Sequence, residues 1–219
     1  MRWILPLAAG LLVHAAMPDD SRAGKQETAI FAGGCFWCIE APFDKVPGVA
    51  SAVSGYTGGP EEDPSYKQVA SGATGHREAV RVIFDPDQVT YEQLVEHFWR
   101  QFDPTDAGGS FYDRGHQYSS AIYYTTETQK EVAERTKATL EASGRFDKPI
   151  VTPILAAGPF YEAEDYHQDY HLKSAAHYNA YRTGSGRDRF IDNVWGDEEA
   201  IVASKPAGKY SRPAGDELR

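Results

Sequence analysis

Two cysteines separated by two residues are the groups of this chain best suited to carry out chemistry. Cys35 and Cys38 are its only cysteines, and two thiols at this spacing can form a disulfide or share a metal ion. They follow Gly33 and Gly34, which permit a sharp turn and a close approach of the backbone. If a helix begins there, Cys35 lies near its N-terminus, where free N–H groups and the helix dipole favour a thiolate over a thiol.

A second set of candidate groups combines carboxyls with phenols. Glu78 begins an otherwise apolar strand, where it is either a solvent-facing carboxylate or a buried, protonated carboxyl that acts as a general acid. Asp113 and Tyr118 are the first and last residues of a polar segment that precedes another strand. They either orient a small polar group or serve as a loop cap and a half-buried phenol. Tyr56 and Tyr66 have the same two interpretations.

Two histidines, His167 and His171, are four residues apart and would share one face of a helix. Together with the cysteines they could form a four-ligand zinc site. The two halves of that set are far apart in the chain, unlike the local spacing of a zinc finger. The other interpretation is that both histidines are partly exposed on an amphipathic helix.

Apolar periodicity predicts the elements that must position these groups. Strands are predicted at 27–32, 49–56, 77–84, 119–125 and 150–157, and helices at 38–46, 90–102 and 126–143. Pro42 requires the first helix to start late, so that the proline falls in its first turn. Residues 103–118 have no period, which is typical of a functional loop, and residues 158–196 are weakly periodic. Alternating strands and helices indicate a single α/β domain, a two-layer sandwich of one mixed sheet with packed helices.

Composition narrows the class of protein. The chain has 219 residues, of which 41% are hydrophobic, enough for one domain with a full core. Its formal charge is −10, and no cluster of Lys and Arg reaches the density of a phosphate-binding face. Nucleic acid is therefore not an expected partner.

The two ends of the chain differ from its middle. Arg2 precedes an apolar stretch at 3–13 and then small residues, the pattern of an export signal that is too short to span a membrane. The alternative is an apolar N-terminus on a cytoplasmic protein. We expect an export signal or mobile segment at 1–26, a catalytic domain at 27–196 and a polar tail at 197–219, with the bacterial periplasm as the location.

Seven segments, in order between about residues 28 and 196, resemble the A-type peptide methionine sulfoxide reductases. They are GCFWCIE (34–40), VSGYTGG (53–59), GHRE (75–78), FDP (84–86), FDPT (102–105), DRGHQY (113–118) and EDYHQDY (164–170). Any one of them is moderate evidence, whereas all seven in order are strong evidence. The resemblance implies reduction of methionine sulfoxide, free or in proteins, at the S epimer of sulfur.

The resemblance also implies roles for individual residues. Cys35 matches the nucleophile that attacks the sulfoxide sulfur, and Glu78 matches the proton donor to the oxygen. Tyr66 and Tyr118 match hydroxyls that bind this oxygen, and Asp113 matches a position that helps to orient the substrate. The aromatic pair between the cysteines would hold the S-methyl group. That pair is Phe36 and Trp37.

Regeneration of the enzyme follows from the same resemblance. Release of methionine leaves Cys35 as a sulfenic acid, and Cys38 is the only other cysteine that can resolve it. Many relatives place the resolving cysteine in a C-terminal tail, and this tail has none. A thioredoxin-like partner would then reduce the Cys35–Cys38 disulfide. The resemblance implies no metal, flavin or nucleotide, and we expect a monomer that repairs oxidative damage.

Two residues depart from the expected pattern, and two other classes of function stay open. His116 stands where relatives commonly carry a small hydroxyl residue, and Pro42 could displace the helix start and so weaken the dipole effect on Cys35. A general dithiol–disulfide oxidoreductase would need the cysteine pair but neither Glu78 nor Tyr118. A metal-binding protein would hold stoichiometric zinc.

Overall fold

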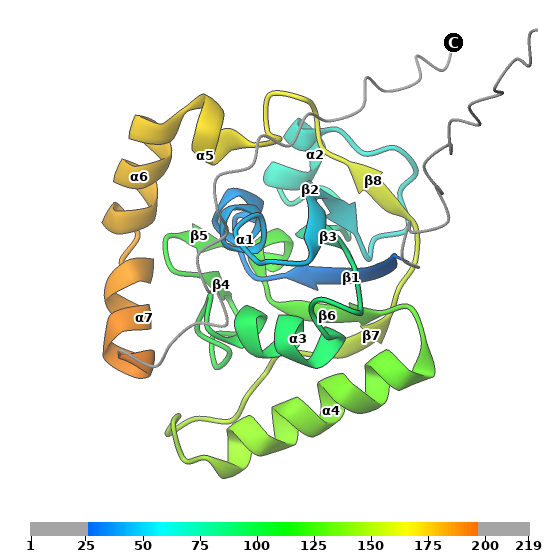
Figure 1. Cartoon of the computed structure of the whole chain (residues 1–219). Coiled ribbons are helices and arrows are strands. Elements are labelled where there is room, and N and C mark those ends of the chain that lie inside the picture. The colour runs from blue at the N-terminus through cyan, green and yellow to red at the C-terminus, as the bar shows by residue number, and fades with distance from the viewer. Residues whose placement is uncertain (1–25, 197–219) are drawn as a thin grey trace, which may run out of the picture.

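Pairing of apolar extended segments builds one main sheet and a short hairpin. The computed structural model describes residues 26–196 (Figure 1). The strands are β1 (Glu27–Ala32), β2 (Val49–Thr57), β3 (Arg77–Phe84), β4 (Gly109–Ser110), β5 (Asp113–Arg114), β6 (Ala121–Tyr124), β7 (Ile154–Ala156) and β8 (Phe160–Glu162). The helices are α1 (Phe36–Phe43), α2 (Tyr66–Ala70), α3 (Tyr91–Trp99), the 3₁₀ turn η2 (His116–Tyr118), α4 (Glu127–Ala142), α5 (Tyr170–Lys173), α6 (Ala175–Gly184) and α7 (Arg187–Trp195).

The main sheet has the strand order β7-β6-β1-β3-β2-β8. All neighbouring strands are antiparallel except β6 and β7, which are parallel. The sheet is therefore mixed and carries packed helices, which confirms the predicted fold class. Because β1 lies inside the sheet, between β3 and β6, the cysteine segment that follows it leaves from the middle of the molecule (Figure 1).

An aromatic cluster attaches the first helix to the sheet. The ring of Phe31 in β1 stacks on Phe43 of α1, with ring centroids 5.1 Å apart, and on Phe98 of α3, with centroids 4.8 Å apart. All three side chains are fully buried, and each contributes about 1.5–3 kcal/mol relative to an exposed position. The cluster holds β1 and α1 in a fixed relation on both sides of the glycine turn that joins them.

Most elements lie where the sequence predicts them. The strands β1 and β3 have the predicted bounds. Thr90 caps α3 in a capping box with Gln93, and Thr126 caps α4, which ends before Gly144 at a φ of +67°. These signals are local in sequence, which is why they could be read without the tertiary structure.

The prediction for Pro42 is wrong. Helix α1 begins at Phe36, so Pro42 lies in its last turn. Proline has no N–H to donate to the carbonyl four residues earlier, which is that of Cys38. Arg182 of α6 donates to this carbonyl oxygen instead, with Nη1 3.2 Å away. A contact distant in sequence thus replaces the hydrogen bond that the proline removes.

The structure also differs from the predictions in three segments. The expected loop at 103–118 contains the β4–β5 hairpin and η2, and the strand predicted at 150–157 shrinks to β7. The weakly periodic segment 158–196 forms β8 and three helices. Short elements of this kind are stabilised by partners far away in sequence, as β8 is by β2. The predicted export signal and polar tail lie outside the described residues. Within residues 26–196, no helix is long and apolar enough to cross a membrane.

Candidate active site

The two cysteines lie at the start of α1, as predicted. Cys35 is the N-cap residue, and its carbonyl oxygen accepts a hydrogen bond from the N–H of Cys38 at 3.0 Å. Both thiols are free and buried, with 6% of Cys35 and 0% of Cys38 exposed. Their spacing within the first turn brings the two side chains together as a hydrogen-bonded pair.

A tight turn delivers Cys35 to this position. Gly34 has a φ of +98°, which favours glycine. A Cβ atom placed there would lie 2.4 Å from the Cβ atom of Ser110 and 3.0 Å from Nη2 of Arg187. The backbone therefore passes close to both neighbours, and only glycine fits.

Gly34→Ala is expected to lower the free energy of unfolding by about 1–3 kcal/mol more than Gly144→Ala does. Gly144 also has a positive φ, +67°, but a Cβ atom there has no neighbour within 4 Å. Both variants strain the backbone, whereas only Gly34→Ala also forces a clash with Ser110. Urea denaturation of the two variants measures the difference, and equal losses would contradict the close approach.

Glu78 is a buried acid beside the first turn of α1. Only 2% of the residue is exposed, and Oε2 accepts a hydrogen bond from the N–H of Phe36 at 3.0 Å. Burial raises the pKa of Glu78 to about 8, although the Phe36 hydrogen bond opposes the rise. The carboxyl is therefore protonated at neutral pH and able to donate. Its interpretation as a solvent-facing carboxylate is wrong.

The negative charge of the reduced pair belongs to Cys38. Burial raises the pKa of Cys35 well above its ordinary value, and the hydrogen bond to Cys38 adds to the rise. That same hydrogen bond lowers the pKa of Cys38 to about 6 against the effect of burial, with help from Arg187 and Arg182. The expectation that the helix N-terminus makes Cys35 the thiolate is therefore wrong in the substrate-free protein, because burial of Cys35 outweighs it.

Two phenols are close enough to Glu78 and Cys35 for their charges to interact. Burial raises the pKa of Tyr66 to about 12 and also raises that of Tyr118, and the charge on Glu78 adds to both rises. Both hydroxyls are consequently hydrogen-bond donors throughout the physiological range. Tyr56 donates instead to Oε2 of Glu164 at 2.8 Å.

Asp113 is held by a tyrosine that the sequence analysis did not identify. Its carboxylate Oδ2 accepts a hydrogen bond from the hydroxyl of Tyr181 in α6. Burial raises the pKa of Asp113, and this hydrogen bond and the charge on Arg187 lower it. His116, the departure from the expected pattern, lies in η2, where its Nε2 atom lies 3.0 Å from the carbonyl oxygen of Gly75.

The aromatic pair between the cysteines packs against the segment around His167. The ring of Phe36 lies 5.0 Å from that of His167 and 6.4 Å from that of Tyr66, centroid to centroid. Trp37 stacks on Tyr170 at 3.8 Å, and its Nε1 atom donates to Nδ1 of His167 at 3.2 Å. Phe36 is buried and Trp37 is half-buried. The two rings thus belong to an aromatic cluster at the start of α1.

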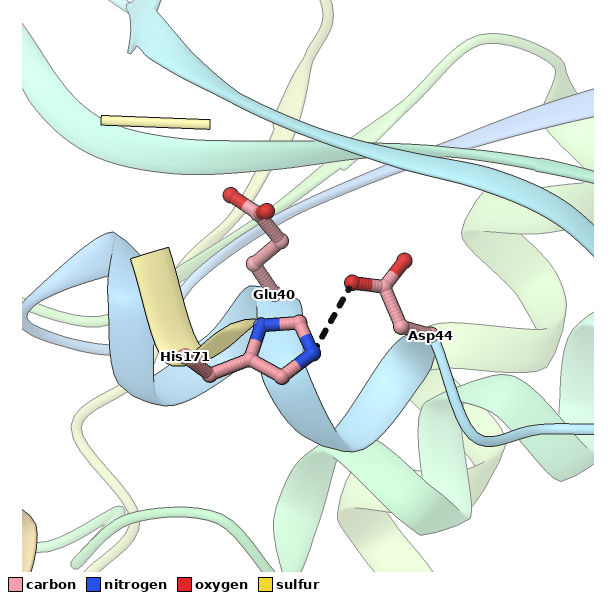
Figure 2. A group of neighbouring side chains, drawn as sticks. All are labelled: Glu40, Asp44 and His171. Atoms are coloured by element: carbon pink, nitrogen blue, oxygen red, sulfur yellow. Dashed lines mark ion pairs between the residues drawn. The ribbon is translucent and has the colours of Figure 1, made fainter. Parts of the chain in front are cut away.

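In the described residues, the two cysteines do not gather with His167 and His171 as the alternative of a four-ligand zinc site would require. Within the described part of the chain, the one group of three potential ligands is Glu40, Asp44 and His171, whose ligand atoms lie within 4.8 Å of one another (Figure 2). His171 Nε2 pairs with Asp44 at 3.7 Å, and Glu40 accepts a hydrogen bond from the N–H of Asp169 at 2.5 Å. This group joins α5 to α1, whereas His167 contacts Trp37.

Three residues of the C-terminal helices were missed by the sequence analysis. Tyr181 donates a hydrogen bond to Asp113. Arg182 donates to the carbonyl oxygen of Cys38, and Arg187 donates to that of Gly33. They lie in the weakly periodic segment, so no pattern indicated that they are partly or wholly buried. The presence of three arginines in a segment rich in Tyr and His was the only available signal.

Comparison with known proteins gives one consistent result. A family model described as peptide methionine sulfoxide reductase matches residues 27–199. The chain is 59% identical to a protein of Bacillus velezensis named peptide methionine sulfoxide reductase MsrA, over 79% of this chain and 98% of that protein. A protein of the same name from Listeria monocytogenes is 57% identical over 77% and 96% of the two chains.

Solved structures agree. Methionine sulfoxide reductase A of Corynebacterium diphtheriae matches with a TM-score of 0.61 and 36% identity, over 68% of this chain and 76% of that one. The reduced form of Mxr1 from Saccharomyces cerevisiae matches with a TM-score of 0.63 and 31% identity, over 72% and 88% of the two chains. The expected resemblance is thereby confirmed: the chain belongs to the peptide methionine sulfoxide reductase family.

Proposed function

We propose that this protein reduces methionine-S-sulfoxide, free or within proteins, to methionine. The observation that carries the proposal is the buried acid Glu78, protonated at neutral pH and hydrogen-bonded at the turn of α1 that bears Cys35. Oxygen is a poor leaving group from a sulfoxide, and a neutral carboxyl supplies the proton that makes it leave. Simple disulfide exchange needs no such acid.

The first half of the reaction uses the two groups together. Cys35 Sγ forms a bond to the sulfoxide sulfur while Glu78 gives its proton to the oxygen. The hydroxyl then passes to the Cys35 sulfur as methionine leaves, so that the sulfoxide is reduced and Cys35 is oxidised to a sulfenic acid. The proton of the Cys35 thiol passes to the Cys38 thiolate, its hydrogen-bonded partner.

The surrounding side chains position the substrate. The hydroxyls of Tyr66 and Tyr118, both protonated, would donate to the sulfoxide oxygen, and Asp113 would orient the rest of the substrate. Phe36 and Trp37 would hold the S-methyl group against their rings. These roles are supported by the effect of the Glu78 charge on both phenols, because it raises the pKa of Tyr66 and of Tyr118.

The second half regenerates the reduced enzyme. Cys38 attacks the Cys35 sulfur, the S–O bond breaks, and hydroxide leaves as water after protonation. A thioredoxin-like dithiol then reduces the Cys35–Cys38 disulfide by exchange. We propose that the reaction needs no prosthetic group. We also propose that the protein acts as a monomer in the repair of oxidised proteins.

The segments at the two ends of the chain enter this proposal only through their sequence. We propose that residues 1–26 direct export to the bacterial periplasm, that residues 27–196 form the catalytic domain, and that residues 197–219 form a polar tail. The basic residue and apolar run at the N-terminus support the first of these.

The test is a turnover assay on the separate epimers. Residues 27–219 are incubated with S- or R-methionine sulfoxide and dithiothreitol, and methionine is measured. Turnover of the S epimer alone is the expected result. Absence of turnover on both epimers, from a folded and reduced sample, would refute the proposal.

A further inference from the structure

Arg187 of α7 is a buried cation that donates to backbone and hydroxyl oxygens. Only 1% of the residue is exposed, and in the described residues no ion pair joins its guanidinium to a carboxylate. A buried charge is costly to folding unless an opposite charge compensates it. The charge on Asp113 and the thiolate of the cysteine pair are the nearby anions whose charges interact with Arg187 without an ion-pair contact.

The contacts of Arg187 fix its guanidinium beside the cysteine turn. Nη1 and Nη2 each lie 3.4 Å from the carbonyl oxygen of Gly33, Nη1 also donates to the carbonyl of Gln101, and Nη2 donates to Ser110 Oγ at 3.2 Å. The ring of Phe111 lies 4.8 Å from the guanidinium carbon. These four neighbours thus fix the position of the Arg187 guanidinium next to the backbone that precedes Cys35.

A second arginine near the pair differs in one respect. Arg182 donates to the carbonyl oxygen of Cys38, but its Nε atom also forms an ion pair with Asp188 at 2.6 Å. Asp188 therefore compensates much of the charge of Arg182. Arg187 forms no such direct ion pair, and its charge acts on both Asp113 and Cys38.

The charged or titratable groups around Cys38 differ in their effect on its thiolate. They come from β3, α1, β5, α6 and α7, and are Glu78, Cys35, Asp113, Tyr178, Tyr181, Arg182 and Arg187. The Glu78 carboxyl and the phenols are neutral at pH 7, and the charge on Asp113 opposes a thiolate. The hydrogen bond from Cys35 and the charges of Arg187 and Arg182 favour the thiolate, and the effect of Arg187 is the larger of the two charges.

We propose that Arg187 is a positioning residue for the resolving step, in which it keeps the negative charge of the pair at Cys38 while it holds the Gly33–Gly34 turn. This inference rests on the proposed function. After methionine leaves, the Cys38 thiol releases the proton that it took from Cys35, and its thiolate attacks the sulfenic sulfur of Cys35, so that the S–S bond forms and the S–O bond breaks. Hydroxide takes up one proton and leaves as water.

The test separates the two halves of the reaction in a single turnover. Reduced protein is mixed with limiting methionine-S-sulfoxide and quenched at intervals, and methionine and disulfide are measured separately. Arg187→Gln, which is neutral but can still donate to Gly33, is expected to form methionine at a rate within about threefold of the unmutated protein. Its disulfide should form more slowly at pH 7, by about twofold if the pKa of Cys38 rises by one from about 6 and by about tenfold if it rises by two, since loss of a nearby opposite charge raises a pKa by about 1–3.

Two further variants identify the charge as the cause. Arg187→Lys keeps the charge and is expected to recover most of the rate of disulfide formation. Arg145→Gln is the matched control, because Arg145 packs over Trp195 and donates to the carbonyl oxygen of Val194, and it is expected to leave both rates unchanged. Arg187→Met is a second neutral variant, to be used if Arg187→Gln does not fold.

A second measurement reports the ionisation directly. In a Cys35→Ser background, Cys38 is the only cysteine, so thiolate ultraviolet absorbance against pH gives its midpoint. Arg187→Gln should raise this midpoint by about one pH unit or more, and Arg187→Lys should restore it. A purely structural role would not move it.

The outcomes distinguish the inference from the proposed function. No methionine from the unmutated protein would count against the function itself. Normal methionine formation together with disulfide rates and midpoints in Arg187→Gln equal to those of Arg145→Gln would overturn the inference about Arg187.

Discussion

Cys35→Ser is expected to abolish methionine formation, whereas Cys38→Ser should form one methionine per protein molecule and then stop. The first substitution removes the nucleophile, and serine at the same N-cap position cannot replace it. The second leaves Cys35 able to react once, but no other cysteine in the chain can resolve the sulfenic acid. The measurement counts methionine released from S-methionine sulfoxide when a thioredoxin system is the only reductant.

Dithiothreitol provides the control for this pair of variants. A small thiol can attack the sulfenic acid directly, so it should restore repeated turnover to Cys38→Ser but not to Cys35→Ser. Repeated turnover of Cys38→Ser with thioredoxin alone would refute the resolving role of Cys38. Activity of Cys35→Ser under either reductant would show that the nucleophile is another group.

Glu78→Gln is expected to lower kcat/KM for S-methionine sulfoxide by about 10²- to 10⁴-fold, the usual effect of removing a general acid. Glutamine can still accept the hydrogen bond of the Phe36 N–H, so the turn of α1 should survive. The unmutated protein needs the protonated carboxyl, whose pKa is about 8, and its activity should therefore fall as the pH rises through about 8. Initial rates against pH, for both proteins, measure the two effects.

The same substitution is expected to stabilise the protein at alkaline pH. Burial raises the pKa of Glu78 from 4.5 to about 8, so between these values the folded state binds a proton that the unfolded state has lost. Stability from this group is thus greatest below pH 4.5 and falls as the pH rises to about 8. Glu78→Gln removes that loss, and urea denaturation at pH 5 and pH 8 should show a smaller decline than in the unmutated protein.

Glu162→Gln is a matched control for the acid, because Glu162 is an exposed carboxylate of β8 paired with Arg81. It should change neither the rate nor the pH profile. If Glu78→Gln kept full sulfoxide reduction, Glu78 would not be the proton donor. If it lost the reductase activity and kept disulfide exchange on insulin, the dithiol chemistry would be intact and the acid would be specific to the sulfoxide.

Local signals account for the elements that the sequence analysis located correctly. The alternation of β3 and the capping residues Thr90 and Thr126 depend on neighbours within a few residues. The helices of segment 158–196 lack such local signals. Contacts with α1, β2 and the cysteine turn stabilise them instead, and these contacts cannot be recognised from residues adjacent in sequence. Pro42 was misjudged for the same reason, since the group that compensates it is Arg182.

The sequence by itself determined the chemistry: a cysteine pair after two glycines, an acid, two phenols and their order along the chain. Only the tertiary structure decided the state of these groups. Burial in the sheet makes Glu78 a neutral acid, and burial of Cys35 together with two arginines from distant helices places the negative charge on Cys38. Protonation depends on desolvation and on charges nearby in space, and neither is a property of the residues adjacent in sequence.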